Sequence, residues 1–222
     1  AVIIQDGMRR MYEKQDNVFY YITVMNENYT HPAMPAGAEG DILKGLYILR
    51  EGGKAAKAPR VQLMGCGTIL REVIAAAELL RNDFGVEADI WSATSFNELR
   101  RDGLSAQRWN MLHPGETPRV SHIGQRLKSR KGTVIAATDY VRGFADQIRA
   151  FVPQRYVTLG TDGYGRSDTR EKLRSFFEVD RRYVAIAALK ALADDGELKA
   201  DVVAQAIKRY AVDSNRVDPW TA

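Results

Sequence analysis

Five polar residues stand close together immediately after an apolar run: Asn26, Glu27, Asn28, Tyr29 and His31. The run itself, VFYYITVM at residues 18–25, is β-branched, aromatic or otherwise apolar throughout and predicts a strand buried on both faces. Proteins with parallel sheets place ligand sites just past the carboxyl ends of their strands. The polar groups that follow this run are therefore candidates for contact with a ligand. The alternative is a polar surface loop that joins two domains.

A glycine pair, Gly65 and Gly67, lies between a predicted strand and a predicted helix. Such a turn can direct helix N–H groups at a pyrophosphate, which raises the hypothesis of a free-standing nucleotide-binding regulatory α/β module. Two features disfavour a bound dinucleotide. Leu70 replaces the third glycine of the fingerprint, and the acidic residue about 20 positions on, Asp89, falls early in the following strand instead of at its carboxyl end. A close turn from strand to helix is the favoured interpretation.

Carboxylates and histidines are common metal ligands, but their positions here predict structural roles. Asp162, Asp168 and Asp180 occur where turns and helix N-termini favour carboxylates. The three histidines are not paired with one another or with the cysteine at ligand spacing: His31, His113 and His122. We expect His113 to be hydrogen-bonded in a turn and His122 to lie on a helix surface. No metal ligand is predicted in this chain.

Composition favours a soluble globular protein. Of the 222 residues, 45% are hydrophobic and 27% are charged, which is enough apolar material for a sizeable core. The net charge of +4 comes from 32 basic and 28 acidic side chains dispersed along the chain, so nucleic acid is not an expected partner. Cys66 has no second cysteine to pair with and is expected to be a small buried side chain in a reducing compartment. With no apolar run of membrane-spanning length and no signal-peptide pattern, we expect a cytoplasmic protein without a membrane partner.

From residue 60 onward, short apolar runs alternate with amphipathic segments. The runs predict four strands, at 61–64, 86–91, 134–137 and 156–159. The segments between them predict helices with the N-caps Thr68, Ser95 and Asp139. Gly103 is expected to end the second of these helices, and two more helices are expected at 181–193 and 199–210. Strands separated by helices predict an α/β fold, a three-layer α/β/α architecture with a mainly parallel sheet.

A glycine-rich stretch follows the last predicted strand. Residues 159–180 read LGTDGYGRSDTREKLRSFFEVD, in which the glycines allow a sharp turn. Asp168 and Glu171 form a variant of the capping box, which predicts that a helix starts directly after the glycines. Strand, glycine loop and capped helix together are what an α/β domain uses to place a loop at the edge of a parallel sheet.

This stretch resembles the C-terminal signature of a known enzyme family, the homodimeric, decarboxylating first component of the pyruvate dehydrogenase complex. Four further segments resemble the same family: NENYTHPAMPAGAEGDILKGLY (26–47), GCGTILREVIAAAELL (65–80), SFNELRRDG (95–103) and RWNMLHP (108–114). The resemblance covers essentially the whole chain in one order. It implies a transketolase-like thiamine-diphosphate enzyme in which residues 1–50 end the pyrimidine-binding α/β domain, 51–60 form a linker and 61–222 form the transketolase-like C-terminal domain.

The resemblance also implies a reaction and its partners. The family decarboxylates pyruvate on thiamine diphosphate with Mg²⁺ and transfers the acetyl unit to the lipoyl group of an acyltransferase component. The implied partners are the remainder of the same subunit, a second subunit in a homodimer, and the lipoyl-bearing acyltransferase. In transketolase-like enzymes the loop that corresponds to 26–31 lies near the mouth of the substrate channel. The resemblance therefore makes Asn26, Glu27, Asn28 and His31 candidates for the channel wall.

The cofactor-holding residues of the family are not expected within this chain. The family binds magnesium and diphosphate through a Gly-Asp-Gly motif and a downstream asparagine, and no suitable asparagine follows the Asp162-Gly163 pair. Its activating glutamate belongs to an earlier part of the pyrimidine domain, so that role is not carried over to Glu27. We therefore predict no catalytic and no cofactor-binding residue here. The isolated chain is expected to be an inactive scaffold and dimer domain.

Overall fold

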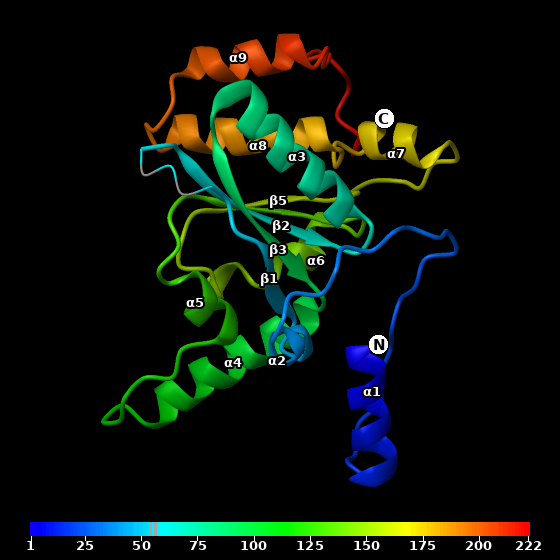
Figure 1. Cartoon of the computed structure of the whole chain (residues 1–222), viewed down its shortest axis with the longest axis vertical. Coiled ribbons are helices and arrows are strands. Elements are labelled where there is room, and N and C mark those ends of the chain that lie inside the picture. The colour runs from blue at the N-terminus through cyan, green and yellow to red at the C-terminus, as the bar shows by residue number, and fades with distance from the viewer. Residues whose placement is uncertain (54, 56) are drawn as a thin grey trace.

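The computed structural model describes residues 1–53, 55 and 57–222. Lys54 and Ala56, which fall in the predicted linker, lie outside the described residues. The centre of the molecule is a five-stranded sheet with the order β1-β3-β2-β4-β5, in which only β1 runs antiparallel to its neighbour. Helices cover both faces of this sheet (Figure 1). The predicted α/β fold with three layers and a mainly parallel sheet is confirmed.

The strands lie where the apolar runs predict them, with one addition. Their bounds are β1 Leu46–Arg50, β2 Arg60–Cys66, β3 Glu87–Ala93, β4 Val134–Ala137 and β5 Tyr156–Leu159. β4 is buried along its whole length, and β2 and β3 are buried along most of theirs. Strands covered on both faces need apolar side chains at consecutive positions, which is why these segments lack the alternation of a half-exposed strand.

The helices form two layers. Above the sheet in Figure 1 lie α3 (Ile69–Phe84) and α8 (Arg181–Asp194), with α9 (Ala200–Arg209) outside α8. Against the opposite face pack α4 (Phe96–Leu112), α5 (His122–Leu127), α6 (Arg142–Asp146) and a 3-10 turn, Arg149–Phe151. Four shorter segments complete the fold: α1 Val2–Met8, the π-helical turn Arg9–Glu13, α2 Glu39–Leu43 and α7 Arg170–Phe176.

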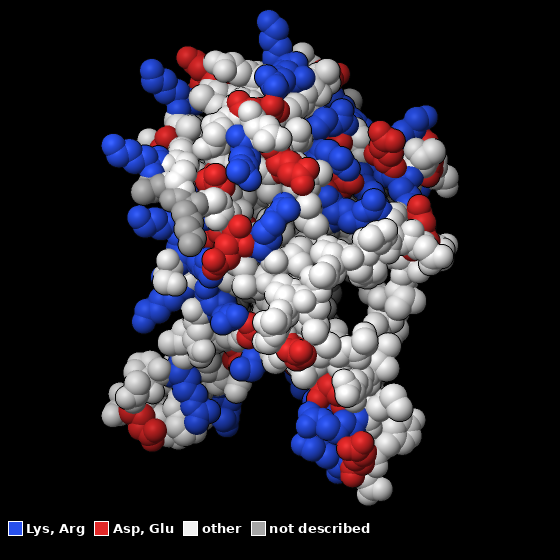
Figure 2. Space-filling view, viewed as in Figure 1, with Lys and Arg blue, Asp and Glu red and all other residues white. Residues whose placement is uncertain are grey.

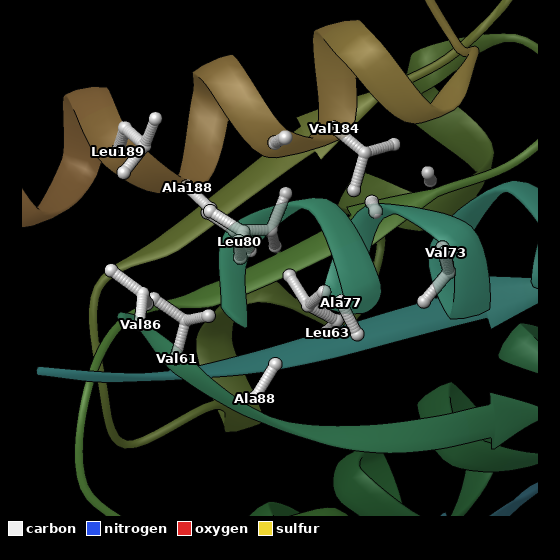
Figure 3. Close-up of a cluster of buried hydrophobic side chains, with 14 of the residues drawn as sticks. Val61, Leu63, Val73, Ala77, Leu80, Val86, Ala88, Val184, Ala188 and Leu189 are labelled. Carbon is white, nitrogen blue, oxygen red and sulfur yellow. The ribbon is translucent and has the colours of Figure 1, made fainter. Parts of the chain in front are cut away.

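Each face of the sheet has its own apolar core. On one face, Val61 and Leu63 of β2 meet Val73 and Leu80 of α3 and Val184 of α8, as Figure 3 shows. The core of the opposite face is built from β1, β3, β4 and the helices on that side of the sheet, and Trp91 and Phe96 are the largest of its fully buried side chains. Burial of apolar surface on both faces fixes which side of each strand faces which helix layer.

The strand predicted at residues 18–25 is wrong for this structure. These residues form neither a strand nor a helix, and Phe19 and Tyr21 are 88% and 87% exposed. A strand needs a hydrogen-bonding neighbour, and this segment pairs with none of the five strands. Instead it leads away from α1, where the Tyr20 hydroxyl donates to Asp6 Oδ2 at 2.7 Å.

The structure also shifts the predicted start of the C-terminal sheet. Residues 46–50 were assigned with the preceding domain, whereas they form β1 and pair with β3 across Leu46 and Ala93. The glycines after β1 are held to the same sheet, because Gly52 N donates to Asp89 Oδ1 at 2.8 Å. The division of the chain into two domains stays a prediction.

Two predicted helix boundaries differ from the structure. Gly103 does not end a helix: α4 continues to Leu112, so Trp109 and Met111 belong to the same helix. A side chain at Gly103 would lie 2.5 Å from the Phe151 ring, so the glycine serves helix packing. Ser95 caps α4, accepting from Glu98 N at 3.2 Å, whereas Asp139 caps no helix, because the N-cap of α6 is Val141. Thr68 is the N-cap residue of α3, as predicted, but its side chain accepts no hydrogen bond from that helix. The Thr68 hydroxyl instead donates to Asp139 Oδ2 at 3.3 Å.

Candidate functional site at the carboxyl edge of the sheet

The loops that follow β2, β4 and β5 meet at one edge of the sheet, because these strands are parallel. Thr161 donates through its hydroxyl to Asp139 O at 2.8 Å and through its backbone N–H to Tyr140 O at 2.9 Å. Asp162 Oδ1 accepts from Arg142 N at 3.0 Å. The loops after β4 and β5 are thus hydrogen-bonded into one surface, and Thr68 joins the loop after β2 to it.

Cys66 ends β2 at this edge. Burial and the nearby carboxylate of Asp139 raise the pKa of the Cys66 thiol to about 11. The group is therefore a neutral thiol at physiological pH, whereas a nucleophilic cysteine needs a lowered pKa. Cys66 was expected to be a small buried side chain, whereas the structure leaves it partly buried at the edge of the sheet, close to Asp139.

Two glycines of the loop after β5, Gly160 and Gly163, are required by close packing. A Cβ at Gly160 would lie 2.5 Å from Arg142 N, and a Cβ at Gly163, whose φ is +101°, would lie 2.7 Å from Pro219 O. The C-terminal residues therefore cross directly over this loop. Arg166 strengthens that contact by donating to Ala222 O.

The three aspartates considered as metal ligands have structural roles. Asp162 receives the Arg142 backbone N–H, and Asp180 caps α8 by accepting from Arg182 N at 2.9 Å and Tyr183 N at 3.2 Å. Asp168 accepts from Thr169 N at 2.7 Å, but the N-cap of α7 is Thr169, one residue later than predicted. Across residues 1–53, 55 and 57–222, no cluster of three or more His, Cys, Asp or Glu side chains could hold a metal ion.

Part of the polar stretch at 26–31 lies against α7 and α3. Arg170 Nη2 donates to Asn26 Oδ1 at 2.6 Å, and Arg170 Nε lies 2.6 Å from Glu27 Oε2. The Tyr29 hydroxyl donates to the same Glu27 oxygen at 2.7 Å. Asn28 and His31 are exposed, and neither side chain forms a hydrogen bond within the described residues. The structure therefore brings Asn26, Glu27 and Tyr29 together and leaves Asn28 and His31 outside this network.

Glu72, which the sequence did not single out, lies buried behind this loop. Arg181 donates to it from its backbone N–H at 3.1 Å and from Nε at 2.9 Å, and Arg174 Nη1 donates at 3.3 Å. Burial by itself would raise the pKa of the Glu72 carboxyl, but the hydrogen bonds and charge of Arg181 outweigh it, so the pKa is lowered below its usual 4.5. In the sequence, Glu72 resembles any acidic residue in the first turn of a helix.

The lowered pKa of Glu72 predicts a pH dependence of stability. A carboxyl group whose pKa is depressed on folding stabilises the fold fully above its unfolded pKa, about 4.3, and loses that contribution as the pH falls through the folded value. We expect the urea midpoint to fall as the pH is lowered from 6 to 3.5, and to fall less in Glu72→Gln. An equal pH dependence in the two proteins would contradict this assignment.

His122 was expected on a helix surface, and that prediction is wrong. The side chain is buried, and its Nε2 lies 2.9 Å from Leu46 O, so it bridges α5 to the start of β1. A buried imidazole is satisfied here by a backbone carbonyl 76 residues away, which no local pattern reveals. His113 has its expected structural role: Nδ1 lies 2.9 Å from Trp109 O, and the ring stacks on Trp109.

The glycine pair after β2 has a packing role. A Cβ at Gly65 would lie 2.6 Å from Leu70 Cα, so only glycine lets the start of α3 approach the strand this closely. Gly67 has a φ of +56°, a left-handed conformation that glycine adopts without strain. Asp89 is likewise bonded inside the protein, accepting from Arg60 Nη1 and Gly52 N at 2.8 Å each. This close approach accounts for the glycine pattern that raised the dinucleotide hypothesis.

Two protein families match this chain, one over the sheet and one over the N-terminal segment. Residues 45–180 match the transketolase-like C-terminal domain, and residues 1–32 match the middle domain of the pyruvate dehydrogenase E1 component. The chain belongs to the transketolase-like C-terminal domain family. The second match covers the polar stretch 26–31, so the contacts between that stretch and α7 join segments assigned to two different domains.

The most similar curated relatives all bear one name, pyruvate dehydrogenase E1 component. The relative from Cupriavidus necator is 64% identical over 221 residues, which is 100% of this chain and 25% of that protein. Those from Pseudomonas aeruginosa and Escherichia coli are 60% and 54% identical, over 99% and 100% of this chain and 25% of each relative. The resemblance to the first component of pyruvate dehydrogenase is thereby confirmed. The chain spans about a quarter of the length of these relatives.

Of the helices in the described parts of the chain, none combines the length and apolar character needed to span a membrane.

Proposed function

We propose that this chain is the C-terminal portion of the decarboxylating component of pyruvate dehydrogenase. The whole subunit would decarboxylate pyruvate on thiamine diphosphate with Mg²⁺ and transfer the acetyl unit to the lipoyl group of the acyltransferase component. The observation that carries the proposal is the 64% identity to a pyruvate dehydrogenase E1 component over the full chain, together with two domain matches in the same order.

Within that enzyme, the segment serves as scaffold and dimer domain. The Asp162-Gly163 pair does not fit the diphosphate and magnesium of the cofactor, because Asp162 is bonded to Arg142 and Gly163 is covered by Pro219. The residues that hold the cofactor then come from the remainder of the subunit, which is the first partner of this chain. A second subunit in a homodimer and the lipoyl-bearing acyltransferase are the others.

The contribution of this segment nearest to the chemistry is a wall of the substrate channel at Asn26, Glu27, Asn28 and His31. Their position in the segment that matches the middle domain supports this role. The exposed side chains of Asn28 and His31 are available to face a channel, whereas Asn26 and Glu27 are held by Arg170. A cytoplasmic location, with neither a membrane nor a nucleic acid as partner, is part of the same proposal.

The test compares the chain with the full-length subunit. We expect the purified 222-residue chain, supplied with thiamine diphosphate and magnesium, to give no pyruvate-dependent reduction of an artificial electron acceptor. The full-length subunit carrying this sequence should reduce the dye under the same conditions. Turnover by the short chain alone would overturn the scaffold assignment, and an inactive full-length subunit would overturn the proposed reaction.

A further inference from the structure

Two arginines of α7 face the polar stretch 26–31 from the side of the C-terminal domain. Arg170 is the first residue of α7 and Arg174 lies one turn later, so the two side chains project from the same face of the helix. We propose that this face is a clamp that fixes the conformation of residues 26–31, which makes Arg170 and Arg174 positioning residues for the substrate channel. The proposal rests on the proposed function for its catalytic consequence only.

Arg170 makes the first contact of the clamp. One guanidinium binds two adjacent side chains, Asn26 Oδ1 and Glu27 Oε2, each at 2.6 Å. A planar guanidinium offers several N–H donors in a fixed geometry, so it can set the relative orientation of the two acceptors, whereas a lysine ammonium is a single point charge. The contact therefore attracts the two side chains and also restricts the backbone conformation at residues 26–27.

Tyr29 makes the second contact. Its hydroxyl donates to Glu27 Oε2 at 2.7 Å and accepts from Arg174 Nη2 at 3.4 Å, and the Arg71 guanidinium lies 4.2 Å from the centre of its ring. Such a cation above an aromatic ring is attracted by the ring's electrons. Tyr29 is accordingly held by three groups from α3, α7 and the loop itself.

The clamp is rigid because Arg174 is itself fixed from behind. Its Nη1 donates to Glu72 of α3 at 3.3 Å, and Glu72 also accepts a hydrogen bond from Arg181 at the start of α8. Three helices of the C-terminal domain thus meet at one buried carboxylate. Figure 2 shows basic and acidic side chains mixed over the region around α7, next to a surface with few charged side chains.

A set of solvated surface ion pairs is the competing interpretation. The Arg170 and Glu27 side chains are 38% and 47% exposed, and an isolated ion pair at that exposure contributes little to stability. What distinguishes the clamp is that Glu27 Oε2 is shared between Arg170 and Tyr29, and that Tyr29 connects onward to Arg174 and Glu72. Charges joined in a network hold one another in place, so loss of one member loosens the others.

The experiment uses the full-length subunit and reads the loop directly. Chymotrypsin cleaves after tyrosine, and cutting after Tyr29 requires that the ring leave its position between Arg71 and Arg174. Mass spectrometry of the fragments gives the initial rate of this cut. We expect Arg170→Ala to raise it about three- to tenfold, since loss of a charge-assisted contact shifts a local opening equilibrium by roughly that factor. Arg170→Lys and Tyr29→Phe should lie between Arg170→Ala and the unmodified protein.

A matched control is available elsewhere in the C-terminal domain. Arg209 of α9 also forms a 2.6 Å ion pair with an aspartate, Asp83, and does not touch residues 26–31. Arg209→Ala should leave the cut after Tyr29 unchanged. Glu27→Gln weakens the same ion pair from the side of the loop. The double variant with Arg170→Ala should be cut more slowly than the product of the two single effects predicts, because the two changes share the contact between Arg170 and Glu27.

The catalytic consequence is measured on the same proteins. We expect kcat/KM for pyruvate to fall about tenfold in Arg170→Ala, with partial recovery in Arg170→Lys, because small displacements of positioning groups have effects of this size. An unchanged rate of cutting after Tyr29 in Arg170→Ala would overturn the clamp. Faster cutting with unchanged kcat and KM would overturn its role in positioning the channel. If the unmodified subunit fails to oxidise pyruvate, the proposed function fails, and the cutting rates still decide the clamp.

Discussion

Replacing Asp89 with alanine is expected to lower the free energy of unfolding by about 3–5 kcal/mol, the range found when one partner of a buried ion pair is removed. Asp89 is 1% exposed and lies on β3. Its Oδ1 accepts from Gly52 N and Arg60 Nη1 at 2.8 Å each, and its Oδ2 accepts from Gln62 Nε2 at 2.9 Å. Alanine would leave all three donors without their acceptor.

The loss would extend into the core through Gln62. This fully buried side chain also donates to Lys131 O at 2.9 Å, and its Oε1 accepts from Trp91 Nε1 at 2.8 Å. Gln62 therefore links the carboxylate of Asp89 to one of the largest side chains of the core. A buried polar network stabilises a fold only while every member is satisfied.

Urea unfolding of the chain measures this effect. Asp89→Asn keeps one oxygen acceptor and should cost less than Asp89→Ala. Glu98 supplies the control, because among the described residues its carboxylate pairs with Arg101 alone, on the surface of α4. Glu98→Ala should therefore change the free energy of unfolding by less than about 1 kcal/mol. A similar cost for Asp89→Ala and Glu98→Ala would show that the network does not stabilise the protein.

The sequence predicted the parts of the fold whose cause is local. The strand predicted at 134–137 agrees with β4 at both ends, and the strand predicted at 156–159 agrees with β5. A short apolar run bounded by polar residues limits where a buried strand can begin and end. β1 was missed because Leu46–Arg50 forms a strand by pairing with β3, whose partner residues lie 40 to 47 positions away in the sequence. The strand predicted at 18–25 is absent because this apolar run has no neighbouring strand to pair with, which its own sequence does not reveal.

The candidate site was predicted only in part. Turn and capping chemistry correctly indicated structural roles for Asp168 and Asp180, since both bond to neighbours in sequence. Asp162 also has a structural role, but its partner Arg142 lies 20 positions away. The contact between Asn26 and Arg170 joins residues 144 positions apart, and nothing in either segment indicates the other. Glu72 and His122 were missed for the same reason: burial and a distant partner define their roles, and neither leaves a local pattern.

Gly65→Ala is expected to destabilise the chain by about 2–3 kcal/mol, the upper range for adding a methyl group to a packed interior. The new Cβ would lie 2.6 Å from Leu70 Cα and 3.1 Å from Leu70 N. These are backbone atoms, so no side-chain rotation can relieve the contact. The first turn of α3 would have to move away from β2, and Ile69 and Val73 would lose part of their packing on the sheet.

Gly143→Ala is the matched control, and its effect should have the opposite sign. Gly143 lies in α6, and a Cβ built there meets nothing within 4 Å. Alanine in a helix is favoured over glycine by about 0.5–1 kcal/mol, so this variant should be slightly more stable than the unmodified chain. Urea midpoints of the two variants test the packing role of Gly65. If both substitutions raised the midpoint, the close approach of α3 would not require glycine at position 65. The glycine turn after β2 would then need another explanation, such as a ligand bound to its backbone N–H groups.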